Sequence, residues 1–505
     1  MKRFSLVLIL LSTLFSQGTI DEQVVARIKI EAFQNSRIMT TLSRITDVYG
    51  GRLTGSPTYL EAANWCVNQM GEWNIKAQLE PWGVVENGWT FDDVAVKVTS
   101  PYYFPIIAYP KAWTSGTAGP ITGQPVLIDI QDSKDIEQYR GQLKGKIVFN
   151  GKPGSANPHF TADAQRMQAD EQGELKALMT PDEYYVPGAS WERYSKWLTT
   201  TDTITQFFAE ESIAVLIEPS ERDHGVVRLT RQTNDPNYVN AFPAIVIARE
   251  QYGRIYRLIE NEFPVELNIN IKTTDYADVQ GYNVIAEIPG TDRKLKNEVV
   301  MLGAHLDSWH AGTGATDDGG NCAILMEAMR IIKALDLKTK RTIRLALWEG
   351  EEQGYFGSLN YVRHHFGNPE DMQLLPEHEK LSVYFNLDEG CGKIRGVYLQ
   401  SNEMARTFFE TCFAPFEYLG VNTISVENVS YTDHMPFNWV GLPGFHLMQD
   451  PIEYRTRTHH TNMDVYEAVL EEDVKLSAAV VATLIYQAAN RLEMIPRLKL
   501  PEPEK

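Results

Sequence analysis

Apolar and polar positions alternate in two different ways in the first half of the chain. Residues 21–50 place apolar side chains at helical spacing, and a second helical stretch follows the turn-rich sequence GGRLTGSPTYL. From about residue 120 to residue 275, short β-branched runs such as PVLIDI and AIVIA stand between Gly, Pro and Asp. This pattern predicts a helical N-terminal part followed by a small β-rich unit.

The second half of the chain alternates buried strands with helices. The runs EVVMLGAHL, TIRLALWEG, LSVYFNLDEG and LPGFHLMQD are typical of strands buried on both faces, and NCAILMEAMRIIKAL has helical spacing. Such alternation predicts an α/β sandwich with a mostly parallel central sheet flanked by helices.

The chain divides into five predicted parts. The start, MKRFSLVLILLSTLFSQG, has two basic residues, an apolar stretch too short to span a bilayer and small residues at its end, which is typical of a secretory signal peptide. We expect the mature protein to be exported, either secreted or periplasmic, without a membrane span. The predicted parts are the signal peptide 1–18, an N-terminal segment 19–119, an insert 120–275, the main part 276–495 and a tail 496–505.

Composition excludes some classes of function. The 505 residues carry a net charge of -19, so the chain offers no basic stripe for nucleic acid. Four widely spaced cysteines give no zinc-ribbon pattern. Cys322 is expected inside a helix, and a disulfide between Cys391 and Cys412 stays open.

Acidic residues and histidines follow the predicted strands. His305 and Asp307 follow the first strand of the second half, and the same loop continues to Asp317 and Asp318. Glu351 and Glu352 follow the next strand, Asp388 follows the third, and His459, His460 and Asp464 lie near the C-terminus. The carboxyl ends of strands in an open α/β sheet collect functional groups, so these side chains are expected to meet.

So many acids at one edge need a compensating positive charge, and imidazole with carboxylate ligands suits zinc. Taken one at a time, Asp317 and Asp318 could cap a helix and the Glu pair could begin one. Taken together, they predict two zinc ions held by five ligands, which are His305, Asp317, Glu352, Asp388 and His460. Asp307 is expected to accept from the imidazole of His305, and Glu351 to face the water.

The stretches GAHLDSWHAGTGATDDGGN, WEGEEQGYFGS, NLDEG, YTDHMPF and HHTNMD together resemble the co-catalytic zinc exopeptidases, a group that contains bacterial aminopeptidases and carboxypeptidase Q-like dipeptidases. The resemblance covers most of the mature chain. It implies a zinc-exopeptidase sandwich, and it implies that the β-rich insert, with RGQLKGKIVF, is a protease-associated domain. HLDSW and GATDDGG are most similar to the carboxypeptidase Q-like branch.

The resemblance also implies roles for single residues. It puts His305, Asp317 and Asp388 on one zinc and Asp317, Glu352 and His460 on the other, with Asp317 bridging. It makes Glu351 the general base, Asp307 the acid that orients a ligand His, and Tyr431 a stabiliser of the oxyanion, with a core tyrosine as the alternative. It further implies a cis peptide between Asp317 and Asp318, and gives no role to His459 or His310.

The implied activity is zinc-dependent hydrolysis of dipeptides or of N-terminal residues of short peptides. A single-zinc acyltransferase similar to glutaminyl cyclases and a non-catalytic binding protein of the same fold stay open as alternatives. The sequence leaves the side-chain preference and the formation of a homodimer undecided.

Overall fold

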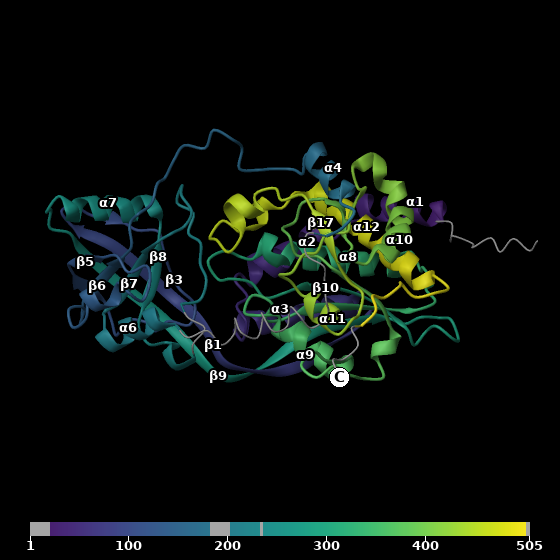
Figure 1. Ribbon diagram of the computed structural model, residues 1–505, viewed down its shortest axis with the longest axis horizontal. Coiled ribbons are helices and arrows are strands. Elements are labelled where there is room, and N and C mark those ends of the chain that lie inside the picture. The colour runs from purple at the N-terminus through teal and green to yellow at the C-terminus, as the bar shows by residue number, and fades with distance from the viewer. Residues whose placement is uncertain (1–20, 182–201, 233–235, 501–505) are drawn as a thin grey trace, which may run out of the picture.

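The protein forms two lobes that are joined by a long two-stranded ribbon (Figure 1). This computed structural model describes residues 21–181, 202–232 and 236–500. The predicted signal peptide therefore lies outside the described residues. None of the helices in the described ranges is both long and apolar enough to cross a bilayer.

The larger lobe is built on a mixed ten-stranded sheet with the order β16-β15-β17-β14-β10-β11-β9-β1-β2, and β4 pairs with β9. Its four central strands, β17, β14, β10 and β11, are parallel, whereas β9, β1, β2 and β4 pair antiparallel. Parallel pairing is thus limited to these four central strands and the edge pair of β15 and β16, and the expectation of a mostly parallel sheet is corrected. The strands are β1 Lys76–Ser100, β2 Phe104–Pro105, β4 Ile121–Gly123, β9 Glu266–Ile288, β10 Val299–His305, β11 Thr342–Trp348, β14 Leu381–Asn386, β15 Ile394–Tyr398, β16 Thr423–Ser425 and β17 Gly444–Gln449.

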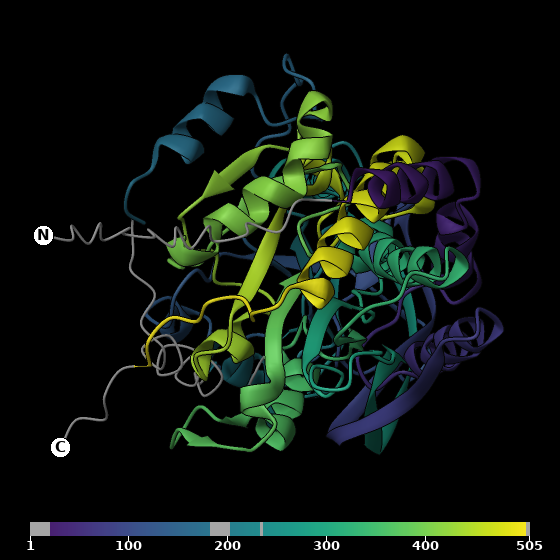
Figure 2. The same cartoon turned by 90° about the vertical axis from the view of Figure 1, so that its right-hand side faces the viewer.

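Helices cover both faces of this sheet. One core joins α1, α2, α3, α8, α10 and α12 to alternate strand residues such as Val300 and Leu302, and another joins α9 and α11 to the intervening residues such as Met301. In Figure 2 the purple N-terminal helices lie beside the yellow C-terminal helix α12. The helices are α1 Glu22–Gln34, α2 Ile38–Ser43, α3 Pro57–Glu72, α8 Gly320–Ala334, α9 Phe356–His365, α10 Arg406–Phe413, α11 Met435–Trp439 and α12 Glu471–Asn490.

Helix α8 sits deepest in the larger lobe, with every residue from Gly320 to Ile332 buried. A helix that is apolar almost all round has to be enclosed, and α8 packs against α12, α2 and β10. Its one buried acid, Glu327, accepts from Arg330 Nε at 2.7 Å. Because α8 cannot shift in this packing, the loop that leads into its N-terminus is held as well.

The smaller lobe carries a separate five-stranded sheet with the order β3-β8-β7-β6-β5. Four of its strands are parallel, and helices α6 and α7 accompany them, so the unit is itself α/β and not purely β. Its first strand precedes residue 120. The elements are β3 Ala108–Pro110, β5 Pro125–Ile128, β6 Ile147–Asn150, β7 Val215–Pro219, β8 Ala244–Ile247, α6 Thr203–Glu211 and α7 Arg249–Glu260.

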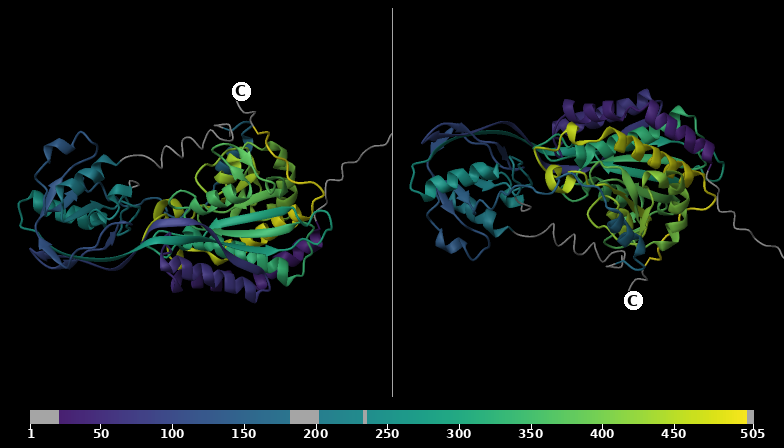
Figure 3. Two further views of the ribbon diagram at one scale, coloured as in Figure 1. Left: turned by 90° about the horizontal axis from the view of Figure 1, so that it is seen from below. Right: turned by 90° about the horizontal axis from the view of Figure 1, so that it is seen from above.

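The ribbon between the lobes consists of β1 and β9, which pair antiparallel from Lys76 with Glu287 to Ser100 with Glu266. It runs from one lobe into the other, as the two views of Figure 3 show. Strand β9 passes without a break through residue 275, where the sequence predicts the insert to end.

A second connection runs from β6 back to the larger lobe, where α4 Ala169–Ala177 packs near β16 (Figure 1). We name residues 151–168 of this connection the strap. Gln165 of the strap forms a β-bridge with Ile452, and Arg166 Nη1 contacts Asp450 at 2.6 Å and Asp473 at 2.8 Å. The short hairpin β12 Gly367–Asn368 with β13 Gln373–Leu374 completes the described strands.

Candidate metal centre

The candidate ligands meet at the carboxyl ends of three neighbouring strands. Strands β11, β10 and β14 lie side by side and parallel. His305 is the last residue of β10, Glu351 and Glu352 follow β11, and Asp388 follows β14. Asp317 joins them from the segment Ala315–Gly319 that leads into α8, where Asp317 and Asp318 have a non-helical backbone. The structure therefore brings together the residues that the sequence predicts to meet.

Two groups of side chains share Asp317. In the first, His305 Nε2 lies 3.3 Å from Asp317 Oδ1 and 3.5 Å from Asp388 Oδ1. In the second, His460 Nε2 lies 3.4 Å from Asp317 Oδ2 and 3.0 Å from Glu352 Oε2. Each carboxylate oxygen of Asp317 thus faces a different histidine, which is the arrangement of a bridging ligand.

These spacings fit ligands around a cation. Two atoms bound to one zinc at tetrahedral angles are about 3.4 Å apart when each bond is near 2.1 Å, and the distances from the two histidines range from 3.0 to 3.5 Å. Within the described part of the chain, Asp317 Oδ2 and Glu352 Oε1 are buried without a hydrogen-bond partner. Buried polar atoms are rarely left unpaired, so the donor set fits a metal.

Electrostatics give a second reason for a cation. Burial, followed by the charge of Asp388, raises the pKa of Glu351 well above its usual value, and burial also raises the pKa of Glu352. Burial acts in the same direction on Asp317, but the hydrogen bond with His305 and the charge of His460 outweigh it and lower that pKa. Burial lowers the pKa of His460 to about 4, so its imidazole is neutral and able to ligate.

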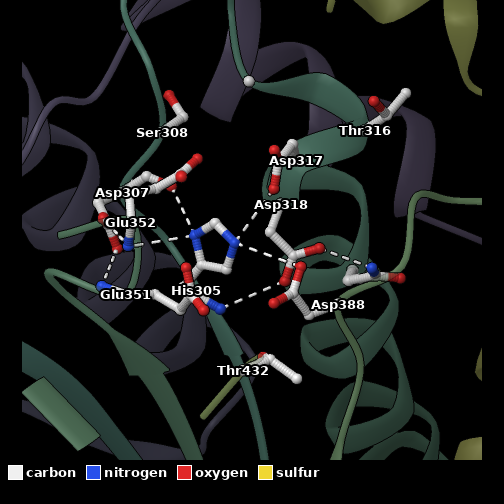
Figure 4. Close-up of polar contacts among 12 residues, drawn as sticks. His305, Asp307, Ser308, Thr316, Asp317, Asp318, Glu351, Glu352, Asp388 and Thr432 are labelled. Atoms are coloured by element: carbon white, nitrogen blue, oxygen red, sulfur yellow. Dashed lines mark hydrogen bonds and ion pairs between the residues drawn. The ribbon is translucent and has the colours of Figure 1, made fainter. Parts of the chain in front are cut away.

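His305 is oriented differently from the expectation. Its Nδ1 donates to the backbone carbonyl of Asp307 at 2.9 Å, whereas the Asp307 carboxylate lies 3.7 Å from that nitrogen (Figure 4). The carboxylate instead accepts from Thr54 Oγ1 at 3.1 Å and from the backbone amides of Glu351 and Glu352 at 3.3 and 3.4 Å. Asp307 therefore ties the two strand-end loops together.

The two adjacent glutamates have different surroundings. Glu352 Oε2 accepts from Trp309 Nε1 at 2.7 Å and faces His460. Glu351 lies within reach of His305 and Asp388 and lines the pocket in front of them. Glu352 therefore lies against His460, whereas Glu351 faces the pocket.

The loop that carries Asp317 is held by two buried side chains. Asp464 accepts from the Thr316 amide at 2.6 Å and from the Asp317 amide at 3.2 Å. Arg52 is fully buried and donates to five backbone carbonyls, those of Leu306, Ile45, Gly50, Thr313 and Gly314. The Asp317–Asp318 peptide bond is cis, which confirms the expectation.

Glycine allows this crowding. Gly314 has a φ of 60°, and a Cβ there would collide with the Ser308 side chain and with Arg52. A Cβ on Gly312 would meet the backbone oxygens of Thr461 and Asp464. The ligand loop can therefore lie against both the Arg52 segment and the C-terminal loop.

The loop that carries His460 is held by the smaller lobe. Leu229 N donates to His460 O at 2.8 Å, Asn462 N donates to Val227 O at 3.1 Å, and Val227 N donates to Asn462 Oδ1 at 2.7 Å. Arg228 and Thr461 form an antiparallel bridge between these segments. No described residue from 120 to 275 belongs to the groups around Asp317, yet this lobe fixes the backbone of one candidate ligand.

His459 also reaches the centre, although the family resemblance assigns it no role. Its Nε2 lies 4.0 Å from Asp317 Oδ2, and its ring centroid lies 3.8 Å from that of His460. His310, by contrast, packs against Trp89 and Phe91, and its Nε2 donates to Pro110 O at 2.8 Å. His310 is thus a core residue.

A pocket of about 730 Å³ opens in front of the ligands. Tyr355, Met435 and Trp439 supply apolar wall, and Arg455 with Glu389 supplies a charged pair. Tyr431 lines the same pocket and is 72% exposed, so it is not a core tyrosine. The four cysteines are buried and free, which answers the open question of Cys391 and Cys412.

Comparisons with known proteins agree with this geometry. Residues 283–485 match the model of Peptidase family M28. Carboxypeptidase Q from Homo sapiens is 31% identical over 262 residues, which are 51% of this chain and 52% of that protein. The chain therefore matches about half the length of this relative.

Two solved structures share the fold. The Peptidase M28 precursor from Shewanella amazonensis aligns with a TM-score of 0.68 and 24% identity, covering 95% of this chain and 99% of that one. A zinc aminopeptidase from Bacillus subtilis aligns with a TM-score of 0.58 and 18% identity, covering 90% and 95%. At sequence identities of 24% and 18%, the similarity concerns the fold alone.

Proposed function

We propose that the chain, whose residues 283–485 match the model of Peptidase family M28, is a metallopeptidase that uses two zinc ions to release single residues from dipeptides or short peptides. The observation that carries the proposal is Asp317, whose two carboxylate oxygens each lie against a different histidine. His305 and Asp388 would complete one zinc site, and Glu352 and His460 the other. The zinc named for the Bacillus subtilis relative supports this choice of metal.

Bound zinc would polarise the scissile carbonyl and make a water molecule acidic near neutral pH. The residues of the chain do the rest. Glu351, which faces the pocket between His305 and Asp388, accepts a proton from the attacking water and returns it to the leaving amine. The Tyr431 hydroxyl, at the rim of the same pocket, donates to the carbonyl oxygen as charge develops there.

The pocket favours short substrates with free ends. Its volume of about 730 Å³ suits a few residues, not an extended chain. Arg455 is exposed at this pocket, paired with Glu389, and offers a guanidinium to a free carboxylate. Met435 and Trp439 offer apolar surface to a side chain. We therefore favour dipeptides over N-terminal trimming of long peptides.

Two features of the wider chain complete the proposal. Export would follow from the leader predicted over residues 1–18, and N-terminal sequencing of the protein recovered outside the cytoplasm would place the cleavage. We assign residues 120–275 to an inserted protease-associated domain that narrows the entrance to the pocket.

The deciding experiment measures metal and activity on the same preparation. We expect two zinc ions per chain at the centre, hydrolysis of free dipeptides, slower hydrolysis of the matching dipeptide amides and none of N-blocked peptides. Removal of zinc with a chelator should abolish hydrolysis, and added zinc should restore it. One zinc per chain with cyclisation of N-terminal glutamine would instead favour the single-zinc acyltransferase, and a zinc-free protein would favour a binding role.

A further inference from the structure

A second group of metal-ligating side chains lies on the smaller lobe, outside the catalytic pocket. His159 and Asp163 belong to the strap, and Asp223 and His224 belong to the turn that follows β7. One ligand atom from each of His159, Asp223 and His224 lies within 4.8 Å of the others. His159 and His224 are exposed, so an ion in solvent can reach them.

Each ring nitrogen of His159 faces a carboxylate within hydrogen-bond reach. His159 Nδ1 lies 2.8 Å from Asp163 Oδ1, which is the length of a hydrogen bond. His159 Nε2 lies 3.2 and 3.3 Å from the two oxygens of Asp223, and the rings of His159 and His224 are 4.3 Å apart at their centroids. The second spacing matches that between ligands at the catalytic centre, where His305 Nε2 lies 3.3 Å from Asp317.

We propose that His159, Asp223 and His224 bind one additional divalent transition-metal ion of the zinc class, with Asp163 as the acceptor that orients His159. Two imidazoles and one carboxylate suit zinc and disfavour calcium and magnesium, which prefer oxygen ligands. The carboxylate on the far nitrogen of His159 is the partner that fixes the tautomer of a ligating imidazole. This site does not depend on the proposed function of the catalytic centre.

Another histidine of the chain shows the contrasting arrangement. His365 lies between Glu80 at 2.7 Å and Glu377 at 3.0 Å, so each ring nitrogen has a carboxylate at hydrogen-bond length. The described residues place His365 in no group of metal-ligating side chains. His159 also has a carboxylate on each ring nitrogen, and what distinguishes its group is the second imidazole of His224, whose ligand atom lies within 4.8 Å of the others.

The position of the group gives the ion a role. Both of its parts contact the loop that leads to the catalytic histidines, because Thr456 Oγ1 donates to Asp163 O at 2.9 Å and Arg222 Nη2 donates to Arg455 O at 2.7 Å. Gln165 N also donates to Ile452 O at 2.8 Å. An ion between His159 and the 223–224 turn would fasten the strap to the smaller lobe directly beside this loop.

The first test counts ions in tag-free, full-length protein. Stripped wild type, His159→Ala and His224→Ala are titrated with Zn²⁺ by calorimetry, with His364→Ala as a control at an exposed histidine outside the group. We expect wild type and His364→Ala to bind one more zinc than the two other variants. Equal numbers in all four proteins would overturn the proposal. The test compares the number of zinc ions bound by wild type and by the variants, so its result does not depend on how many ions the catalytic centre holds.

The second test examines geometry and consequence. Co²⁺ added after the catalytic sites are filled should give the visible absorption of a tetrahedral site in wild type and not in His159→Ala, and Asp163→Asn should weaken binding by about 10 to 100-fold. Zinc should also slow tryptic cleavage of the strap after Arg166 in wild type but not in His159→Ala. Identical cobalt spectra and cleavage rates in wild type and His159→Ala would contradict the assignment.

Discussion

The candidate metal centre is held from two sides that are built differently. His305, Asp317, Glu352 and Asp388 come from the ends of neighbouring parallel strands or from the loop that leads into helix α8, which is buried from Gly320 to Ile332. His460 lies on a loop whose backbone pairs with residues 227–229 of the smaller lobe. The first side depends on the core of the larger lobe, and the second depends on how the two lobes meet.

This difference has a consequence for the two metal positions. A ligand at the end of a buried strand keeps its place as long as the sheet is folded. A ligand on a loop keeps its place only through the contacts that the loop makes. We therefore expect the His460 side of the centre to respond to changes in the smaller lobe, and the His305 side to be insensitive to them.

The largest effect is expected within the strand-end side, at the adjacent glutamates. Glu351→Gln keeps the volume of the side chain but removes the base, so kcat should fall by about 10² to 10⁴-fold with zinc content unchanged. Glu352→Ala removes a candidate ligand and should weaken one zinc by at least about 10 to 100-fold. Zinc per chain and dipeptide turnover are measured for both. Loss of zinc from Glu351→Gln, with retention by Glu352→Ala, would reverse the two roles.

The next effect tests the support of the strand-end side. Arg52→Met leaves five backbone carbonyls without their shared donor, and each unpaired buried group costs about 1 to 3 kcal/mol. We expect the free energy of unfolding to fall by about 3 kcal/mol or more in chemical denaturation. Arg44→Met, at a neighbouring exposed arginine, should change it by less than about 0.5 kcal/mol. Equal stability of the two variants would show that the hydrogen bonds of Arg52 do not stabilise the strand-end side.

A smaller effect tests the support of the His460 side. Asn462→Ala removes the acceptor of the Val227 amide without altering any candidate ligand. We expect a loss of about 10-fold in affinity for one zinc, while the other zinc binds as in wild type. Asn462→Asp keeps an acceptor oxygen and should bind both ions normally. An equal weakening of both zinc ions by Asn462→Ala would mean that the two sides are not independent.

The smallest effect concerns the rim of the pocket. A preorganised oxyanion donor is worth about 10² to 10³ in kcat, but Tyr431 is 72% exposed and competes with water. Tyr431→Phe should therefore lower kcat by less than about 10-fold and leave KM unchanged. Tyr418→Phe, at a tyrosine that is 76% exposed elsewhere, serves as the control. A kcat equal to that of wild type would exclude the hydroxyl from catalysis.

The sequence predicted the parts of this molecule that depend on local pattern. Strands β10, β11, β14 and β17 and helix α8 lie where apolar runs indicate them, because nearly all residues of each are buried. The meeting of the five candidate ligands was also predictable, since successive strand ends share one edge of a sheet.

Features that depend on partners distant in sequence were not predictable. The ribbon of β1 and β9 was missed because its residues are only partly buried and alternate weakly in polarity. The backbone carbonyl that orients His305 cannot be recognised from residue types. The sequence therefore suggested the carboxylate of Asp307 as the partner, whereas the structure shows its carbonyl oxygen. His459 was expected at this edge without a role, and its distance of 4.0 Å from Asp317 depends on a loop that the smaller lobe holds.

The ribbon also determines how the two lobes could be recombined with those of other proteins. Val85 pairs with Val279 and Asn87 with Ala277, so a graft of the smaller lobe has to cut both strands at such partner positions. A junction that is displaced by one residue on a single strand would turn every following side chain to the opposite face. The lobe is therefore exchangeable as one continuous segment only when its two splice points are matched across the ribbon.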